Sequence, residues 1–182
     1  MSQLIPGNLL TTAMAILPHD DVDAALELAL SLDIPFWPQL PHVSYYEDMY
    51  VQAAEHFPGI ILLPETNSIR FDTDKFYEEL PEMLAHWEEL AYFDISETYS
   101  VVYHRFLEMD LSSYPAIRGQ LEGPVSFGMK LLDEHDRPLI FNEQVRQVLM
   151  DFMARRAQAQ LTHLKTKHPG AFMFIDEPGL QF

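Results

Sequence analysis

The clearest structural signal in this chain is the sequence Ala171-Phe172-Met173-Phe174-Ile175-Asp176-Glu177-Pro178. Five uninterrupted apolar residues, bounded by Gly170 and Pro178, are too short for an independent helix and predict a strand buried on both faces. Asp176 and Glu177 follow where that strand must emerge. Ligands bind beyond the carboxyl ends of parallel strands that alternate with helices. We therefore expect both carboxylates to bind a small-molecule substrate, although an isolated Asp-Glu-Pro can equally cap a turn.

Three earlier segments end in a similar way and predict further strands of the same sheet. They are residues 9–17, which lead into Pro18-His19; residues 34–42, which contain three prolines; and residues 114–126, which include an exit loop. Proline cannot donate a hydrogen bond to a sheet, so residues 34–42 predict either an irregular strand or a loop.

Helical periodicity and capping patterns predict helices between these strands. The predicted starts are Asp20, Ser44 with Glu47, about Asp74, Asp94 with Glu97, and Asn142. The helix that starts near Asp74 contains Pro81, which predicts a kink or a break. Residues 60–63 and 68–71 flank a polar turn and predict a β-hairpin outside the main repeat.

Strands that alternate with helices predict right-handed crossovers and a parallel sheet. Four such strands in 182 residues amount to half of an eight-stranded barrel. We therefore expect an α/β fold of the (β/α)8 TIM-barrel type, of which residues 1–182 form a single domain. This domain supplies the first half of the barrel, with about four parallel strands and a β-hairpin excursion.

Composition excludes several classes of function. The formal net charge of −17 opposes binding to nucleic acid and to anionic membranes, both of which attract Lys and Arg. No apolar run approaches the ~20 residues of a membrane-spanning helix, and residues 1–6 lack a signal-peptide profile, so we expect a cytoplasmic protein. The chain contains no cysteine, which excludes disulfides, thiolate nucleophiles and zinc–thiolate sites within it.

The third predicted strand carries polar side chains on one side. Arg118, Gln120 and Glu122 alternate with smaller or apolar residues at a period of two. A buried parallel strand is normally apolar on both faces, so this row predicts either a wet cavity or a set of buried partners. An acidic partner for Arg118 is the simpler alternative. Gly123-Pro124 then predicts a tight exit into a helix that begins with proline.

The carboxyl ends of the predicted strands gather polar residues on one rim. These residues are His19, Gln39, His42, Glu122, Asp176 and Glu177. Further candidates for substrate binding are Arg118, Gly123 and Ser126. Such groups can bind a polar substrate, exchange protons with it or hold a hard metal ion. Zinc sites normally need three or four protein ligands, so we assign no metal ligand in this chain. The sequence contains neither a glycine-rich phosphate loop nor a nucleophile elbow. The residues therefore support proton transfer or substrate orientation by carboxylates.

Four motifs resemble, in the same order, the first half of the catalytic barrel of cobalamin-independent methionine synthase. They are Thr11-Thr12-Ala13-Met14-Ala15-Ile16-Leu17-Pro18-His19, Glu47-Asp48-Met49, Gly123-Pro124-Val125-Ser126 and Ile175-Asp176-Glu177-Pro178. That barrel is related to uroporphyrinogen decarboxylases and corrinoid-dependent methyltransferases. The motifs span nearly the whole chain, and Asp-Glu-Pro at a strand end is the most specific of them.

The resemblance implies methyl transfer to a small thiol such as homocysteine, with either folate or a corrinoid as methyl donor. It implies that Asp176 helps to hold the amino-acid substrate and that the loop from Gly123 to Ser126 borders the folate-side cavity. The chain departs from the family at residues 15–17, where bulky residues replace small ones, and at Val43, where an acidic residue is expected. The family's zinc ligands belong to the second half of the barrel, so we expect zinc only where that half is present.

Two other functions remain open. In a decarboxylase-like or corrinoid-methyltransferase-like barrel, Arg118 and His19 would bind an anionic polycarboxylate. In a non-catalytic half-barrel, the chain would act as a binding or assembly module. An open four-stranded half exposes its inner face and an unpaired edge, which is an aggregation hazard unless it is covered. We therefore expect either a homodimer or association with a C-terminal barrel half.

Overall fold

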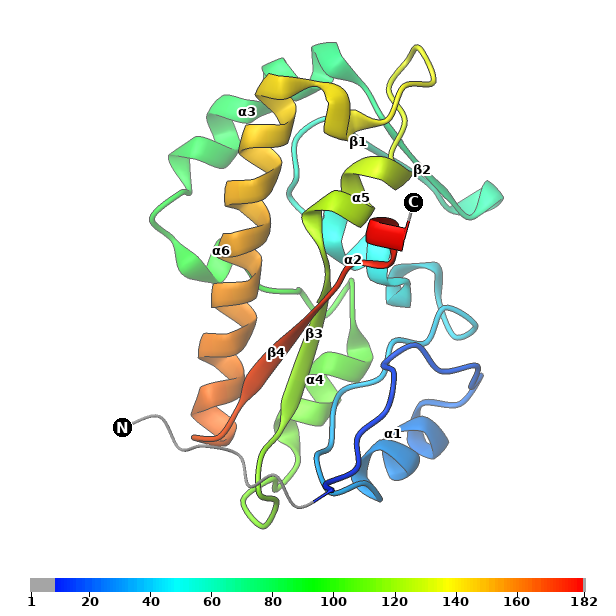
Figure 1. Cartoon of the computed structure of the whole chain (residues 1–182), viewed down its shortest axis with the longest axis vertical. Helices are drawn as coiled ribbons and strands as arrows, with labels where there is room; N and C mark the ends of the chain where they lie inside the picture. Colours follow the sequence, from blue (N-terminus) through cyan, green and yellow to red (C-terminus); the bar gives the residue numbers. More distant parts are fainter. Residues whose placement is uncertain (1–8, 182) are drawn as a thin grey trace.

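The computed structural model describes residues 9–181 and has a mixed α/β architecture (Figure 1). The strands are β1 (Ile60–Leu63), β2 (Ser68–Phe71), β3 (Arg118–Glu122) and β4 (Phe172–Asp176). The α-helices are α1 (Val22–Leu30), α2 (Met49–Ala54), α3 (Thr73–Ala85), α4 (Val101–Glu108), α5 (Pro124–Lys130) and α6 (Glu143–Lys167). The 3-10 helices are η1 (Tyr45–Glu47), η2 (Pro64–Thr66), η3 (Leu90–Phe93), η4 (Leu139–Phe141) and η5 (Pro178–Gln181).

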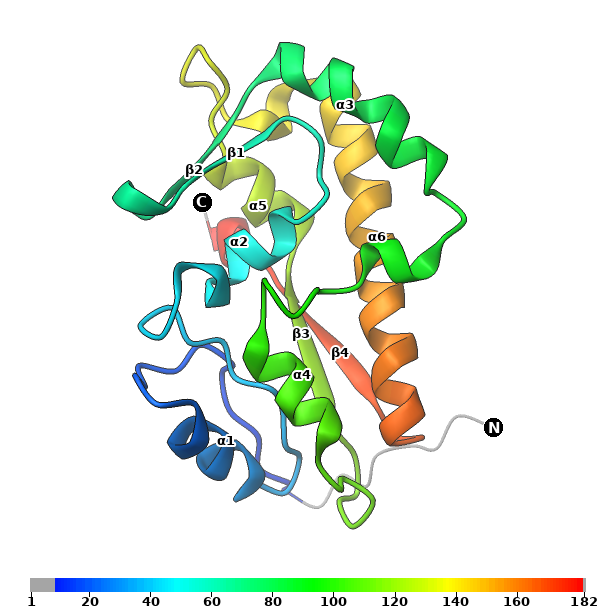
Figure 2. The same ribbon diagram turned by 180° about the vertical axis from the view of Figure 1, so that it is seen from behind.

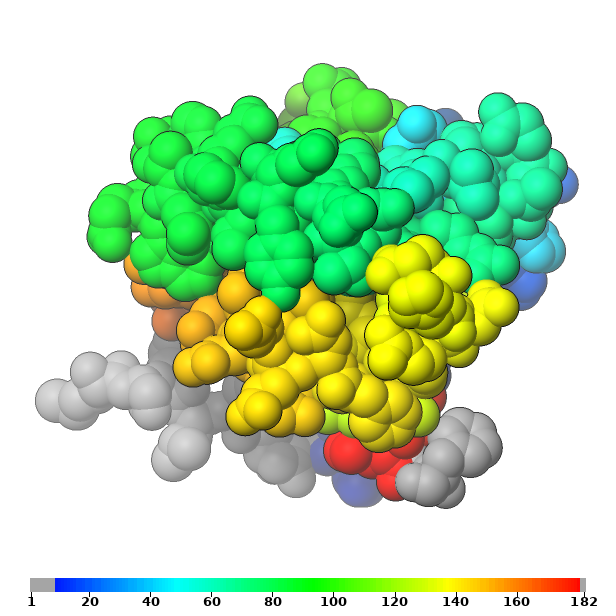
Figure 3. All heavy atoms as spheres, turned by 90° about the horizontal axis from the view of Figure 1, so that it is seen from above, coloured from blue at the N-terminus to red at the C-terminus, as the bar shows by residue number. Residues whose placement is uncertain are grey.

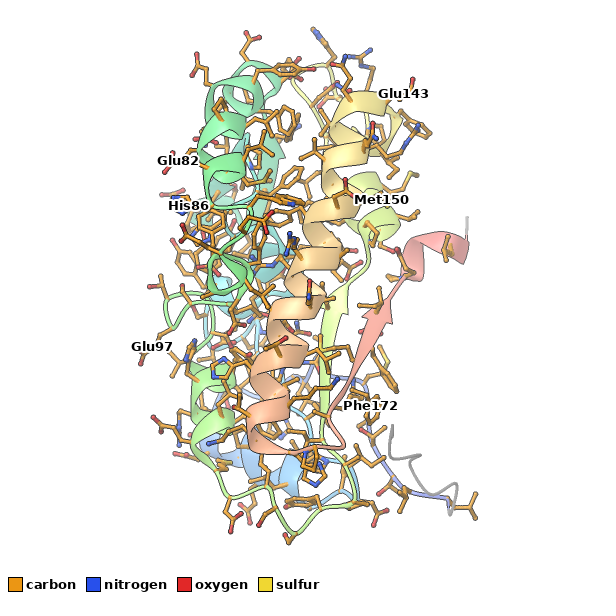
Figure 4. The ribbon with its side chains drawn as sticks, turned by 90° about the vertical axis from the view of Figure 1, so that its left-hand side faces the viewer. Glu82, His86, Glu97, Glu143, Met150 and Phe172 are labelled. Carbon is orange, nitrogen blue, oxygen red and sulfur yellow. The ribbon has the colours of Figure 1, made fainter. Side chains whose placement is uncertain are left out.

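The centre of the molecule is the parallel pair of β3 and β4, which confirms the prediction for both segments. The long helix α6 runs antiparallel to the pair and returns the chain from one end of the sheet to the other, so that Glu143 and Phe172 lie at opposite ends (Figure 4). Asn142 starts this helix as predicted, because its side chain accepts a hydrogen bond from the Val145 amide at 3.3 Å.

The first two predicted strands join the sheet through isolated parallel bridges only. Ile16 pairs with Gln39, and Phe36 pairs with Arg118. The Leu17 amide donates to the Gln39 carbonyl oxygen at 3.0 Å. Residues 9–17, residues 34–42, β3 and β4 therefore lie side by side in chain order, as in a parallel sheet. The segments are too irregular to count as strands, and no closed barrel is present among residues 9–181.

The prediction that the last strand is buried on both faces is wrong. In β4, the Phe174 and Ile175 side chains are 41% and 47% exposed. The cause is that β4 pairs along one edge only, with β3, and no described segment pairs with its other edge. The first segment is likewise half open, since Met14 and Ile16 are exposed while Ala15 and Leu17 are buried.

The predicted hairpin is confirmed. Strands β1 and β2 pair in antiparallel register, with Ile60 opposite Phe71. The helix expected from about residue 74 begins one residue earlier and ends at Ala85. Pro81 lies inside it without breaking it, and residues 90–93 form the separate η3.

Three predicted helix starts need correction. Asp21, not Asp20, caps α1 by accepting from the Ala24 amide at 2.7 Å. Ser100, not Asp94, caps α4. Ser44 caps only the short η1, and a second cap, Asp48, starts α2. In each case more than one polar residue near the start of the helix could serve as its cap.

The elements, which Figure 2 shows from behind, are held together by two large buried clusters and a small third one that contains Ala15, Ala29 and Phe36. The largest one packs α6 and α5 against the hairpin and α3 through phenylalanine rings, among them Phe57 and Phe152, whose ring centroids are 5.2 Å apart. The other large one centres on Trp37 and Tyr103, whose ring centroids are also 5.2 Å apart, and fixes α1 and α4 beside the sheet. Seen from above, the hairpin and α3 lie along one side and residues 131–150 along the other (Figure 3).

Candidate functional site

The two paired strands bring two acidic residues together at their carboxyl ends. Glu122 and Asp176 are register partners in the parallel pair, so their side chains leave the same face of the sheet side by side. The Gly123 amide donates to the Asp176 carbonyl oxygen at 2.7 Å and closes this end of the pair. The strand ends point toward α5 and η5 (Figure 1). This end of the sheet, with Glu122, Asp176 and Glu177, is the rim.

Glu122 is the most enclosed acidic group on the rim. It is 2% exposed, and its Oε1 atom is buried without a hydrogen-bond partner. The pKa of its carboxyl group is raised to about 7, mainly by burial and to a smaller extent by the negative charges of Asp176, Glu177 and Asp48, while a hydrogen bond with Tyr50 opposes the shift. Glu122 therefore exchanges its proton near neutral pH.

Asp176 has a different environment although it is adjacent to Glu122. Its side chain is half-buried, and burial raises the pKa of its carboxyl group, while the positive charge of Arg118 lowers it. The carboxylate of Asp176 therefore has a compensating cation within the chain, and that of Glu122 has not. Two neighbouring carboxyl groups with separated proton affinities are typical of sites that handle protons or cations.

Each guanidinium nitrogen of Arg118 donates a hydrogen bond to another residue of the protein. Its Nε atom donates to Thr12 Oγ1 at 3.2 Å, and a second donor reaches the Ala13 carbonyl oxygen. Its guanidinium group lies between the rings of Phe36 and Phe174, 4.8 and 4.4 Å from their centroids. Burial lowers the pKa of Arg118 to about 10.

The polar side chains on β3 are thus buried and bonded to other residues, which is the second of the two alternatives that their alternation predicted. Arg118, Gln120 and Glu122 are all buried. The acidic partner expected for Arg118 is not its direct contact, because the acceptors of its hydrogen bonds are the neutral oxygens of Thr12, Ala13 and Gln120, the last at 3.4 Å. Gln120 in turn donates to the Trp37 carbonyl oxygen at 2.6 Å. These hydrogen bonds join β3 to residues 34–42 through Trp37 and to residues 9–17 through Thr12 and Ala13.

Glu177 caps the helix that follows β3. Its carboxylate accepts hydrogen bonds from the Val125 amide at 3.0 Å and from the Ser126 amide and hydroxyl at 2.7 Å each. The Ser126 hydroxyl also accepts from the Gly179 amide at 2.8 Å. A side chain at Gly123 would collide with this carboxylate, since a Cβ atom there would lie 2.1 Å from Glu177 Cδ. The alternative reading of Asp-Glu-Pro as a cap therefore applies to Glu177.

The other predicted rim residues are dispersed. Gln39 is buried and donates to Gln52 Oε1 at 2.9 Å, while its own Oε1 atom has no partner. His19 is half-buried, and its Nδ1 atom has no partner. His42 is exposed and lines a pocket of about 480 Å³ between α2, the hairpin turn and Lys130. Within residues 9–181, no recorded contact joins either histidine to Glu122 or Asp176.

Sequence reasoning missed a buried network around Glu47. Its carboxylate accepts from Ser100 Oγ at 2.8 Å, from the Val102 amide at 3.1 Å and from Gln52 Nε2 at 3.0 Å. Gln52 continues the network to Gln39. Burial raises the pKa of Glu47. The pattern that suggested a capping box assigned Glu47 a local partner, whereas two of its three partners, Ser100 and Val102, lie more than fifty residues away at the start of α4.

Tyr50 was also missed, because in the sequence it is one aromatic residue in a helix. It is the residue of α2 that forms a hydrogen bond with Glu122, and burial raises the pKa of its hydroxyl group. Tyr50 also lines the 480 Å³ pocket, and a second pocket of about 300 Å³ beside Ser126 and Gly179. It therefore separates the buried carboxyl group of Glu122 from two surface pockets.

The described part of the chain contains no group of three or more His, Asp or Glu side chains placed to hold a metal ion. No helix within residues 9–181 has the length and apolar character needed to cross a membrane. Comparison of the chain with protein-family models, curated proteins and solved structures returns no match.

Proposed function

We propose that this chain forms the amino-acid-binding half of a methyltransferase barrel that resembles cobalamin-independent methionine synthase and transfers a methyl group to a small thiol such as homocysteine. The observation that carries the proposal is the position of Asp176. It is a half-buried carboxylate at the carboxyl end of β4, in register with Glu122 and on the side of the sheet where ligands of α/β proteins bind.

The chemistry of the rim fits the ammonium group of an amino acid. The positive charge of Arg118 favours the ionised form of Asp176, and Arg118 donates its hydrogen bonds to Thr12, Ala13 and Gln120 rather than to this carboxylate, which stays available to a ligand. A carboxylate in a half-buried site binds an ammonium group more strongly than one in open water, because the effective dielectric constant is lower.

The proposal assigns activation of the thiol to a second barrel half. A zinc-bound thiolate needs three or four protein ligands, and residues 9–181 do not supply such a set, so no zinc-dependent step is derived from this chain. The second half, or a second copy of the chain, would also cover the free edge of β4. The methyl donor, folate or corrinoid, belongs to the same completed site.

A decarboxylase-like function has less support from the same residues. A polycarboxylate needs several cations that face it, whereas Arg118 is held by the protein and the neighbouring groups, Glu122 and Asp176, are acidic. His19, the other expected cation, has no recorded contact with them within the described residues. The rim therefore favours a ligand with a positive charge.

Isothermal titration calorimetry tests the proposal. We expect L-methionine and L-homocysteine to bind, N-acetyl-L-methionine to bind at least tenfold more weakly because its nitrogen carries no charge, and Asp176→Asn to weaken binding of both amino acids by a similar factor. Asp151→Asn is the matched control, since Asp151 is exposed on α6, away from the rim. Equal affinity of the Asp176→Asn variant and the unmodified protein would reject the role of Asp176.

A further inference from the structure

We propose that Glu122 carries a proton while the rim is free of ligand, and that it releases this proton to solvent when an ammonium group binds beside Asp176. The ligand class rests on the function proposed above, whereas the behaviour of Glu122 follows from its own surroundings. No covalent bond of the ligand changes: the ammonium group keeps its protons, and the proton that leaves comes from the Glu122 carboxyl group.

The first argument is that Glu122 has an incomplete set of hydrogen bonds. One carboxyl oxygen, Oε1, is buried and unpartnered, and the side chain as a whole is 2% exposed. An ionised carboxylate in such a position loses hydration that the protein does not replace. The neutral carboxyl group costs less to bury, and its Oε1 atom retains one unmade interaction.

The second argument is the balance of charge around this carboxyl group. The groups that act on Glu122 come from two places: Asp48 and Tyr50 at the start of α2, and Asp176 and Glu177 at the end of β4. Arg118, at the start of β3, acts on Asp176. Lys130 is more remote, with its ammonium group 6.0 Å from the centre of the Tyr50 ring. Three acidic neighbours surround Glu122, and Arg118 compensates Asp176 rather than Glu122.

The third argument concerns what a bound cation changes. Glu122 and Asp176 are direct neighbours across a parallel pair, where strands are about 4.8 Å apart. An ammonium group that pairs with Asp176 therefore lies within a few ångströms of Glu122. An opposite charge at this distance favours the ionised form of a carboxyl group. Binding of the ligand then expels the proton, and Glu122 becomes the second carboxylate that holds the ammonium group.

Calorimetry in pairs of buffers with different ionisation enthalpies measures the protons released. With L-methionine as the probe, we expect release of about 0.9 proton per ligand at pH 6, about 0.5 at pH 7 and about 0.1 at pH 8, because the free carboxyl group titrates near pH 7. The affinity should rise roughly fivefold from pH 6 to pH 7 and roughly tenfold from pH 6 to pH 8.

Glu122→Gln removes the titrating group and keeps its shape. We expect this variant to release no proton at any of the three pH values and to bind L-methionine with an affinity independent of pH. Glu143→Gln, at an exposed position in the first turn of α6, is the matched control and should behave as the unmodified protein. Binding of L-methionine at pH 6 without proton release, or release that persists in Glu122→Gln, would overturn the inference.

A second measurement needs neither the variant nor an amino acid. Carbon-13 NMR of labelled carboxyl groups follows the titration of Glu122 in the unmodified protein, in methylammonium chloride and in sodium chloride at the same ionic strength. We expect saturating methylammonium to lower the apparent pKa of Glu122 by one unit or more. An unchanged titration would contradict the inference even where L-methionine binds. Failure of L-methionine alone to bind would instead contradict the proposed function.

Discussion

Glu122 and Asp176 illustrate how neighbouring residues of the same chemical type acquire different roles. Both lie at the end of a strand, and both carboxyl groups are raised in pKa by burial. The positive charge of Arg118 favours the ionised form of Asp176 without a direct contact, while Glu122 has only acidic neighbours beyond its hydrogen bond with Tyr50. Glu122 is therefore partly protonated near neutral pH, whereas Asp176 has a cation that opposes the effect of burial on its pKa.

Glu177, by contrast, stabilises the loop that carries these residues. We expect Glu177→Ala to lower the free energy of unfolding by about 1–3 kcal/mol, because three donors at the start of α5, two of them backbone amides, lose a charged acceptor. Urea unfolding followed by circular dichroism measures this change. Glu97→Ala serves as the control, since Glu97 is exposed ahead of α4, and it should stay within about 0.5 kcal/mol. An equally small effect in Glu177→Ala would show that the cap is dispensable.

The sequence predicted the pairing of Glu122 with Asp176 better than the role of each. Parallel strands end at a common edge, so two acidic residues at strand ends could be placed together from their positions alone. The distinction between Asp176 and Glu177 depends on which side chain turns toward α5, more than fifty residues away in the sequence. No local pattern carries that information, and the same holds for the partners of Glu47.

The unit of β3, α5, α6 and β4 was predictable because its signals are local. Gly123-Pro124 fixes the start of α5, and Asn142 starts α6 through a hydrogen bond three residues along the chain. The hairpin is equally local, with strands separated by the short η2. These elements position the rim, because they fix where β3 and β4 end.

The irregular segments beside β3 were less predictable. Residues 34–40 are buried throughout, as a central strand would be, but Pro35 and Pro38 remove donors from the ladder and only one bridge to each neighbour remains. Residues 9–17 have apolar side chains on both faces, which suggested a buried strand, yet Met14 and Ile16 are exposed. Burial of a strand depends on its neighbours in space, which its own sequence does not specify.

The free edge of β4 predicts association. An unpaired strand edge with exposed Phe174 and Ile175 is a site for pairing with another chain. We expect light scattering on a sizing column to give the 182-residue chain a mass above that of one molecule, and Ile175→Lys to lower it by placing a charge on the edge. Leu84→Lys, at an exposed position on α3, is the control and should leave the mass unchanged. A stable monomer at high concentration would contradict this prediction.

Over the whole molecule, the charge distribution supports the same choice of ligand. A chain with a net charge of −17 repels polycarboxylates and attracts cations, and the acidic rim adds a local field of the same sign. The long-range part of this attraction falls with added salt, while the contact with Asp176 is partly shielded from solvent. The composition opposed nucleic acid and anionic membranes as partners, and the proposed cationic ligand agrees with the same negative charge.

The most direct test of the account is a crystal structure of the protein with L-methionine. The account predicts that the ammonium nitrogen lies within hydrogen-bond distance of the Asp176 carboxylate and beside Glu122, while Glu177 remains bound to the start of α5. A ligand bound instead in the 480 Å³ pocket beside His42 and Lys130, with Asp176 and Glu122 uncontacted, would contradict the central claim that the carboxyl ends of β3 and β4 form an amino-acid site.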